Sequence, residues 1–393
     1  MPLITDLPNI VANLPSYKRA RFERLMRLDA SQGECVIPDS MREWTLKHFG
    51  SIEAVQHQNI LRITNVWTWE GAVYNPIRGM RPVEMTTRLR SRNDRRPTMV
   101  PQSSVVGRPS SPPSPPPEDV FAEPLKTTAA DVFGRVQGQY CISTGNIARW
   151  EGQHAVLIFN EFDPLKFTRA HLRDYFRTSL EWAQLAHAQE PRARYFIWTW
   201  NGGVKGGASI PHAHAQMALA QGMHYGRIEQ LRHAAVAYRA QHGSNYFEDI
   251  VAAHADVGLA FEVAGLPALA YLPALRAKDT WVIGRAFDEQ LADGLCDVLR
   301  VLIDQANMGA FNVAVLMPPL FADASVADYG ADEDWSDFPV IARIVDRGSP
   351  AMLSSDIGAL DIFAHQVNPV DPFGLVEILR PACADGKVSQ TSS

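Results

Sequence analysis

Cysteine is scarce in this sequence, and the few cysteines lie far apart. The 393 residues contain four, and no two of them form a Cys-x-x-Cys pair. This spacing excludes a disulfide framework and a thiolate zinc site as organising features of the fold. We therefore expect no structural zinc site of the Cys-x-x-Cys type, and we predict no metal ligands and no cofactor, while the sequence leaves open whether a metal site without cysteine ligands exists.

Long apolar runs and an excess of positive charge are also missing. No stretch approaches the roughly eighteen apolar residues that a membrane-spanning helix needs, so we expect no membrane partner. A net charge of −6 argues against a general nucleic-acid partner. The first residues do not combine a basic start with an apolar segment, which predicts no signal peptide and a cytoplasmic location. A hydrophobic content of 46% is typical of a globular chain.

A Pro/Ser-rich run divides the chain. The sequence GRPSSPPSPPPED, residues 107–119, cannot pack a core and predicts an extended linker or loop. It separates an N-terminal segment, residues 1–106, from the remainder. At the other end we expect a flexible tail over residues 381–393.

Between these segments, a pattern of hairpin, helix, strand and strand occurs twice. The first copy, residues 120–245, is expected to contain a hairpin, a helix capped by Thr168 and two strands, over residues 139–159, 168–188, 194–200 and 212–219. The second copy, residues 246–380, repeats the order over residues 259–273, 279–286, 288–306, 310–319 and 338–348. The pattern predicts an α+β fold made of a duplicated unit, with helices packed on antiparallel sheets.

Two histidines on one face of a predicted strand are the clearest functional signal. NGGVKGGASIPHAHAQ, residues 201–216, places His212, His214 and Gln216 two residues apart behind a glycine-rich loop. Alternate residues share a face of a strand, so these three side chains point one way and the alanines between them face a core. Loop N–H groups and the Ser209 hydroxyl can bind phosphate oxygens, and imidazole is a nucleophile toward phosphorus.

The string HAHAQ resembles the H-x-H-x-Q motif of the histidine-triad superfamily, in the branch of galactose-1-phosphate uridylyltransferases and diadenosine tetraphosphate phosphorylases. The approach GASIPH is similar to the Gly-x-Ser-x-Pro-His approach of that family. The resemblance implies a duplicated histidine-triad-like fold and a covalent nucleotidyl intermediate on the second histidine, His214. It implies two further catalytic residues and three substrate-binding residues in the motif: His212 and Gln216, and Asn201, Gly207 and Ser209.

A second similarity lies in YNPIRGMRP, residues 74–82. It resembles the Asn-Pro element and the Arg-x-x-Arg-Pro phosphate-binding segment of the family, which implies that Arg78 and Arg81 bind nucleotide phosphates. Two features depart from the family. The Cys-x-x-Cys through which many uridylyltransferases bind zinc is missing, and Ala213 stands where they commonly have proline. Relatives are often dimers, so a homodimer is compatible with the resemblance.

Together these residues predict a nucleotidyltransferase. It would move a nucleoside monophosphate from a nucleotide donor, expected to be a nucleotide sugar, to a phosphate or sugar-phosphate acceptor. A phosphorylase of dinucleoside polyphosphates or nucleotide sugars is an alternative with the same chemistry. A nucleotide-binding protein without turnover is an alternative of another class. The sequence leaves the base, the sugar, the acceptor and the oligomeric state open.

Each of the outlying residues has a competing structural interpretation. Surface ion pairs would equally account for Arg78 and Arg81, and a turn cap for Asn201. Lys278 is expected to be a solvated charge. His154 has no neighbour in the sequence that marks it as functional.

Overall fold

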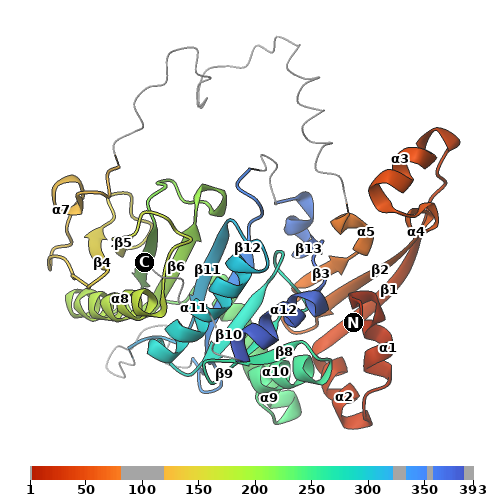
Figure 1. The fold of residues 1–393 in the computed structure, drawn as a ribbon. Coiled ribbons are helices and arrows are strands. Elements are labelled where there is room, and N and C mark those ends of the chain that lie inside the picture. Colours follow the sequence, from red (N-terminus) through yellow and green to blue (C-terminus); the bar gives the residue numbers. More distant parts are fainter. Residues whose placement is uncertain (1, 81–118, 322–332, 352–356, 385–393) are drawn as a thin grey trace, which may run out of the picture.

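The centre of the molecule is one nine-stranded sheet. The structure, a computed structural model, describes residues 2–80, 119–321, 333–351 and 357–384 (Figure 1). The strand order of the sheet is β4-β5-β7-β6-β11-β12-β10-β9-β8. Its strands are β4 (Cys141–Gly145), β5 (Gln153–Phe159), β6 (Tyr195–Gly202), β7 (His214–Ala220), β8 (Ala260–Val263), β9 (Leu266–Ala270), β10 (Thr280–Gly284), β11 (Phe311–Leu316) and β12 (Val340–Asp346).

The sheet consists of two halves with the same element order. β4, β5, α8 (Arg169–Gln189), β6 and β7 form the first, and β9, β10, α11 (Glu289–Asp304), β11 and β12 form the second. The predicted α+β fold with a duplicated unit is confirmed. Its strands pair antiparallel throughout, and the halves meet where β6 pairs with β11, with Trp200 opposite Val313. The sequence pattern predicts each half but not this union into one sheet.

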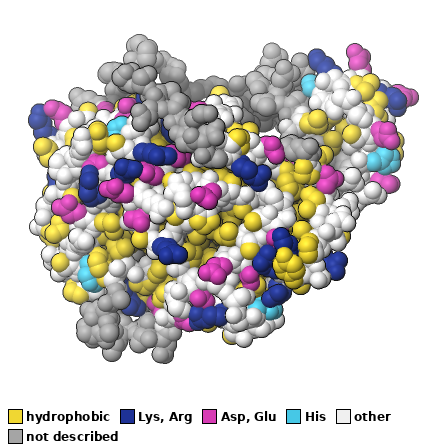
Figure 2. Space-filling view, turned by 60° about the horizontal axis from the view of Figure 1, so that its bottom comes forward, with side chains coloured by type: hydrophobic (Ala, Val, Ile, Leu, Met, Phe, Trp, Pro, Cys, Tyr) yellow, Lys and Arg dark blue, Asp and Glu magenta, His cyan; other side chains and the backbone are white. Residues whose placement is uncertain are grey.

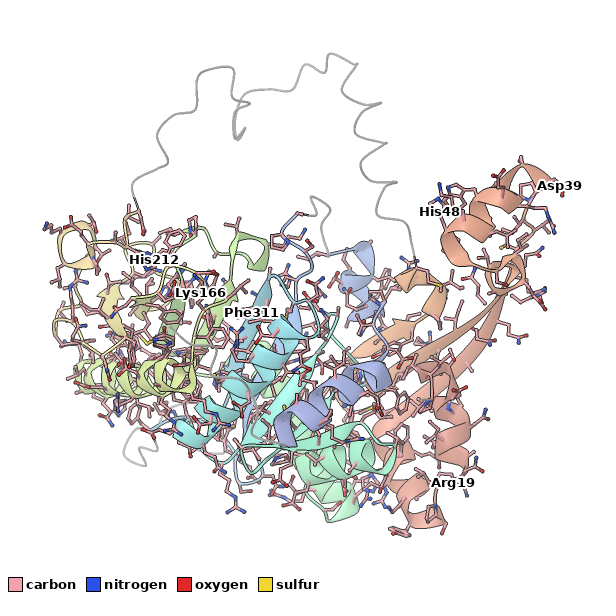
Figure 3. The ribbon with its side chains drawn as sticks, in the orientation of Figure 1. Arg19, Asp39, His48, Lys166, His212 and Phe311 are labelled. Carbon is pink, nitrogen blue, oxygen red and sulfur yellow. The ribbon has the colours of Figure 1, made fainter. Side chains whose placement is uncertain are left out.

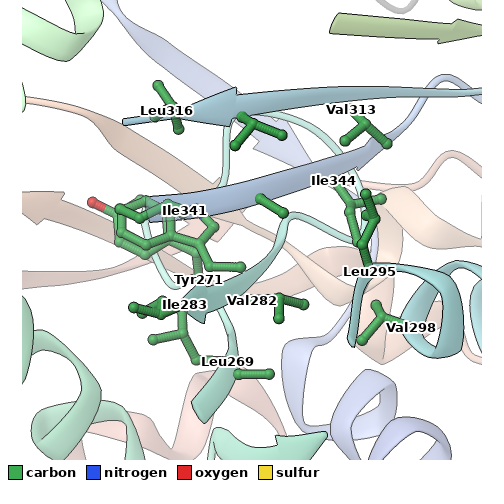
Figure 4. Close-up of a cluster of buried hydrophobic side chains, with 14 of the residues drawn as sticks. Leu269, Tyr271, Val282, Ile283, Leu295, Val298, Val313, Leu316, Ile341 and Ile344 are labelled. Atoms are coloured by element: carbon green, nitrogen blue, oxygen red, sulfur yellow. The ribbon is translucent and has the colours of Figure 1, made fainter. Parts of the chain in front are cut away.

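Capping residues start both long helices where the sequence places them. The Thr168 side chain accepts a hydrogen bond from the backbone N–H of His171, and Asp288 accepts one from Leu291 at the start of α11. Such caps satisfy N–H groups that the first helical turn leaves without a partner. Figure 4 shows the core of the second half, where α11 and β9 to β12 bury aliphatic side chains including Leu295 and Ile344. Each fully buried side chain of this kind contributes about 1.5 to 3 kcal/mol.

Two ion pairs connect α8 to α11. Arg169 Nε lies 2.8 Å from Asp297 Oδ1, and Arg173 Nε lies 2.7 Å from Asp293 Oδ1. Both pairs are bidentate, since the second guanidinium nitrogen of each arginine bonds the other carboxylate oxygen. Arg173 follows Arg169 by four residues on α8, whereas its partner Asp293 precedes Asp297 by four residues on α11. The two helices therefore run antiparallel.

The N-terminal segment builds a second, smaller sheet of order β1-β2-β3-β13. Its strands are β1 (Met26–Glu34), β2 (His57–Asn65), β3 (Gly71–Tyr74) and β13 (His365–Asn368), the last of which is parallel to β3. The other helices are η1 (Ile4–Asp6), α1 (Leu7–Ala12), α2 (Ser16–Leu25), α3 (Asp39–Phe49), α4 (Ile52–Gln56), α5 (Pro76–Gly79), α7 (Pro124–Thr127), η2 (Val204–Gly206), α9 (Gly226–His242), α10 (Tyr246–Asp256), η3 (Ala359–Phe363) and α12 (Pro372–Ala384).

Only parts of the expected linker and tail can be compared with the structure. Of the linker, residues 107–118 lie outside the described residues, and Asp119 is placed. Of the tail, residues 381–384 belong to α12 and residues 385–393 lie outside. The domain boundaries therefore stay predictions.

None of the helices in the described ranges is both long and apolar enough to cross a bilayer. On the face in Figure 2, described side chains of both charge signs are interspersed.

Arg343 connects the small sheet to the large one. Its side chain is 5% exposed; Nη1 donates to Glu70 Oε1 at 3.0 Å and Nη2 donates to Asp279 Oδ2 at 2.7 Å. Glu70 precedes β3 in the small sheet, and Asp279 precedes β10 in the large one. The guanidinium carbon also lies 5.3 Å from the ring centroids of Tyr271 and Trp281. One buried cation thus pairs with two buried carboxylates from different layers, and Arg227 is a second partner of Glu70.

We predict that Arg343→Leu lowers the free energy of unfolding by about 3 to 5 kcal/mol, because it leaves the buried Asp279 carboxylate without its cation and removes one of the two arginines that pair with Glu70. Urea denaturation followed by circular dichroism measures this loss. The control is Arg62→Leu, which removes an exposed partner of Asp29 and should cost less than about 1 kcal/mol. Equal losses in the two variants would contradict the connecting role of Arg343.

Candidate active site

The histidine motif lies on the sheet face turned away from α8. In β7, His214 is opposite Ile158 of β5, and Ala215 is opposite Trp200 of β6. Ala215 and Met217 belong to the main core beneath α8, whereas Ile158 belongs to a separate small cluster on the other face. The predicted alternation is therefore confirmed. β7 begins at His214, so His212 stands just before the strand (Figure 3).

The ring of His214 has one nitrogen fixed and one nitrogen available. Nδ1 lies 2.7 Å from the backbone oxygen of His212, and a carbonyl only accepts, so Nδ1 carries the proton. The lone pair is then on Nε2. His214 is 5% exposed, and this burial lowers the pKa of its imidazole below the usual 6.5, which favours the neutral ring at pH 7. The edge of Phe121 packs against it, with ring centroids 5.2 Å apart.

Both ring nitrogens of His212 face acceptors. Nε2 lies 2.7 Å from the backbone oxygen of Phe159, and Nδ1 lies 2.7 Å from Asp119 Oδ2. Burial raises the pKa of Asp119, but hydrogen bonds from His212 and from the Phe121 N–H outweigh it and lower the pKa overall. The ring of His212 is thus held between the Asp119 carboxylate and a backbone oxygen. The backbone of His212, rather than its ring, therefore sets the tautomer of His214.

His154 orients the third motif residue. It is fully buried in β5, and its Nδ1 accepts a hydrogen bond from the Trp150 N–H at 3.2 Å. The single proton of the neutral ring is then on Nε2, which donates to Gln216 Oε1 at 3.1 Å. Asn146 Nδ2, 3.3 Å from the same nitrogen, is a donor and does not compete for this bond. Burial also lowers the pKa of His154. The oxygen of Gln216 is thus engaged, and its amide nitrogen is the end left for a ligand.

The sequence missed His154 as a functional residue, and it also missed Asp119 and Phe121. A histidine inside the otherwise apolar stretch HAVLIF was the available signal for His154. Asp119 offered none, because it is the last residue of the Pro/Ser-rich run and its contact with His212 spans 93 residues of sequence.

The glycine-rich loop satisfies several of its own amides. The N–H of Gly206 donates to Gly203 O at 2.9 Å, and the N–H groups of Gly207 and Ala208 donate to Val204 O and Gly203 O. The expectation that loop amides face a phosphate is therefore wrong for these three groups. Gly207, with φ +98°, and Ser209 are exposed beside them.

Close packing on Phe311 explains two of the loop glycines (Figure 3). A Cβ on Gly202 would lie 2.5 Å from the Phe311 ring, and a Cβ on Gly206 would lie 2.6 Å from the Phe311 backbone oxygen. Neither position has room for a side chain. The first residue of β11, at the junction between the halves, thus forms the floor of the loop.

The structure brings Asn201 to the histidines but does not bring Arg78 there. Asn201 follows Trp200, which pairs with Ala215, so the register places it next to His214 on the same face. Arg78 is exposed in α5, which Figure 1 shows beside β3 on the opposite side of the molecule from β5. Arg81 lies outside the described residues.

The expectation that Lys278 is a solvated charge is wrong. Its Nζ lies 2.5 Å from Asp346 Oδ2, and the two side chains are 12% and 8% exposed.

Within the described ranges, no group of three or more His, Cys, Asp or Glu residues is arranged to hold a metal ion. What the site offers is one neutral imidazole with a free lone pair, flanked by two side-chain amides.

The nine-stranded sheet with paired helices defines a fold class that the chain shares with a phosphorylase, a GalT-like protein and a uridylyltransferase of known structure. Within it, the chain is similar to an ADP-glucose phosphorylase from Arabidopsis thaliana solved with bound ADP-glucose, with a TM-score of 0.51 and 17% identity over 79% of this chain and 94% of that one. It is similar to a GalT-like protein from Arabidopsis thaliana, with a TM-score of 0.52 and 19% identity over 69% and 92%.

A uridylyltransferase is a third similar structure, with a TM-score of 0.51 and 16% identity over 72% of this chain and 94% of that one. No protein-family model matches the chain, and no curated protein matches it in sequence. At these identities, the likeness establishes the fold.

We predict that His214 and His154 hold opposite neutral tautomers at pH 7. The contacts put the proton of His214 on Nδ1 and that of His154 on Nε2. Long-range ¹H–¹⁵N correlation spectra of histidine-labelled protein distinguish the two tautomers, and His214→Ala and His154→Phe assign the signals. The same tautomer at both positions, or a charged ring at His214, would contradict the geometry.

Proposed function

We propose that this protein is a nucleotidyltransferase that works through a covalent nucleotidyl intermediate on His214. The observation that carries the proposal is the His214 ring. Its Nδ1 proton is held by the His212 carbonyl at 2.7 Å, and burial keeps the ring neutral, so Nε2 presents a lone pair at pH 7. A fixed neutral imidazole of this kind is a competent nucleophile. The shared fold with ADP-glucose phosphorylase and a uridylyltransferase supports the same chemistry.

In the first step, the His214 Nε2 lone pair attacks the α-phosphorus of a nucleotide donor. The bond from phosphorus to the bridging oxygen breaks, and the phosphate or sugar phosphate leaves with the electron pair as an anion that needs no proton. The ring then carries Nδ1–H and a phosphorylated Nε2. Its positive charge is stabilised by the His212 carbonyl. An oxygen of the acceptor phosphate next attacks phosphorus, and the P–N bond breaks to restore the neutral ring.

The flanking groups supply donors to the phosphoryl oxygens. Gln216, oriented by His154, and Asn201, beside His214, present amides there, and Gly207 lies beside the Asn201 amide. We propose that the Ser209 hydroxyl is a further donor. Donors placed before the reaction stabilise charge that develops in the transition state. Of the two arginines expected to bind the distal phosphate, Arg78 does not lie near His214, and Arg81 lies outside the described residues; we therefore assign neither of them a role in this step.

The donor class we propose is a nucleoside diphosphate sugar, because one of the similar structures contains ADP-glucose. The acceptor distinguishes the two possible enzymes: a phosphorylase uses inorganic phosphate, and a transferase uses a sugar phosphate. We propose no metal and no cofactor in the reaction, since the imidazole is the nucleophile and the leaving group is already anionic.

Intact-protein mass spectrometry at neutral pH tests the covalent step. We expect a mass gain of one nucleoside monophosphate after incubation with at least one of UDP-glucose, ADP-glucose, a GDP-sugar and diadenosine tetraphosphate. His214→Ala should show no gain, and the exposed His233→Ala should label as the wild type does. Nucleotide binding without an adduct from any donor would favour the binding protein without turnover.

We predict that His154→Phe slows this labelling about tenfold to a hundredfold, because the Gln216 amide loses the bond that orients it. The affinity for the donor should change little, since His154 lies behind Gln216. Single-turnover labelling over a range of donor concentrations separates the rate from the affinity, with thermal unfolding as a check on folding. Wild-type rates in a folded variant would show that Gln216 needs no such support.

A further inference from the structure

A row of polar side chains runs from the second half of the sheet to the glycine-rich loop. Arg347 follows β12, Asn312 lies in β11 opposite Asn201, and Asn201 lies near the end of β6. Arg347 Nη1 donates to Asn312 Oδ1 at 2.5 Å. Asn312 Nδ2 donates to Asn201 Oδ1 at 2.7 Å and to the backbone oxygen of Gly206 at 2.6 Å. The row ends at the residue that stands beside His214.

Arg347 and the backbone oxygen of Gly206 together determine the direction of the hydrogen bonds in this row, since a carbonyl only accepts. A guanidinium has only donors, so the amide of Asn312 must turn its oxygen to Arg347 and its nitrogen to Asn201. Asn201 must then accept through its oxygen, which leaves Asn201 Nδ2 as its donor end. This nitrogen borders the space over Gly207, since it is the nearest atom, at 3.9 Å, to a Cβ built on that glycine.

Few donors other than Asn201 Nδ2 are available to a phosphate next to the glycine-rich loop. The N–H groups of Gly206, Gly207 and Ala208 are already used within the turn, so they do not supply the donors that a bound phosphate needs. Two side-chain amides remain next to His214: Gln216 along β7 and Asn201 across on β6. An amide that presented its oxygen instead would repel an anionic ligand.

We propose that Arg347 and Asn312 are positioning residues that fix Asn201 as a hydrogen-bond donor to an oxygen of the phosphoryl group at His214. The inference rests on the proposed nucleotide site and extends it to the second half of the chain. It gives that half, which has no histidine pair, a part in phosphate recognition. A nucleoside without a phosphate does not contact this donor, so the row discriminates phosphorylated from unphosphorylated ligands.

The isosteric variant Asn312→Asp tests the direction of the row. The carboxylate that this substitution introduces still accepts from Arg347, but it cannot donate to Asn201, which then turns its nitrogen to the new carboxylate and its oxygen to the ligand. Isothermal titration calorimetry with AMP, UMP, adenosine and uridine measures the result. We expect the mononucleotide affinity to fall about tenfold to a hundredfold, the range for a lost hydrogen bond to a charged group, and the nucleoside affinity to stay unchanged.

Two further variants separate positioning from charge and from folding. Asn312→Leu lacks the donor without adding charge and should weaken AMP and UMP in the same direction. Ser349→Asp adds an acid at an exposed position close to Arg347 in the sequence, and it should leave both affinities near the wild-type values. If Ser349→Asp weakens AMP and UMP as much as Asn312→Asp does, the effect is long-range charge and the proposal is overturned. Thermal unfolding identifies any variant that has lost its fold.

The outcomes distinguish this inference from the proposed function. Unchanged AMP and UMP affinity in folded Asn312→Asp and Asn312→Leu overturns the positioning role, whether or not His214 is labelled. A selective loss of mononucleotide affinity without labelling of the wild type upholds the positioning role and removes the proposed transfer reaction. A wild type that binds none of the four probes overturns both.

Discussion

The antiparallel pairing of β6 with β11 is the contact on which the rest of the molecule depends. It joins two halves that each have only one main helix into a single nine-stranded sheet. It places Phe311 beneath Gly202 and Gly206, which gives the glycine-rich loop its floor. It also brings α8 and α11 side by side, where two arginine–aspartate pairs connect them. A change that weakened this pairing would therefore disturb the core and the site together.

Buried polar groups in this site are arranged in chains in which every member has a defined role. His214 donates to a backbone oxygen, His212 lies between Asp119 and a backbone oxygen, and His154 accepts from one group and donates to Gln216. An unpaired polar group in such a place costs more than a hydrogen bond usually contributes, so partial networks are unfavourable. The same chains fix proton positions. The stability of the site and the position of the lone pair of His214 thus have a common origin.

Local patterns accounted for the parts of the structure that depend on local physics. The spacing of apolar residues gave the helices and strands of both halves, and alternation gave the shared face of His214 and Gln216. Contacts between segments far apart in the sequence could not be predicted. Nothing in the sequence near Asp119 points to His212, which lies 93 residues away. Nothing near Asn312 points to Asn201, because sheet register brings this pair together only after the halves join. The role of His154 depended on the same kind of register, across β5 and β7.

The parallel pairing of β13 with β3 has a consequence for the order of folding during synthesis. His365 pairs with Gly71, so the small sheet takes its last strand from a segment that emerges from the ribosome long after the first three. Until then, β3 has an open edge with unsatisfied backbone groups, a surface that invites wrong partners. Contacts this distant in sequence also close slowly. The N-terminal segment therefore exposes an unpaired strand edge for some time during synthesis. The large sheet does so less, because most of its strands pair with strands that are near them in sequence.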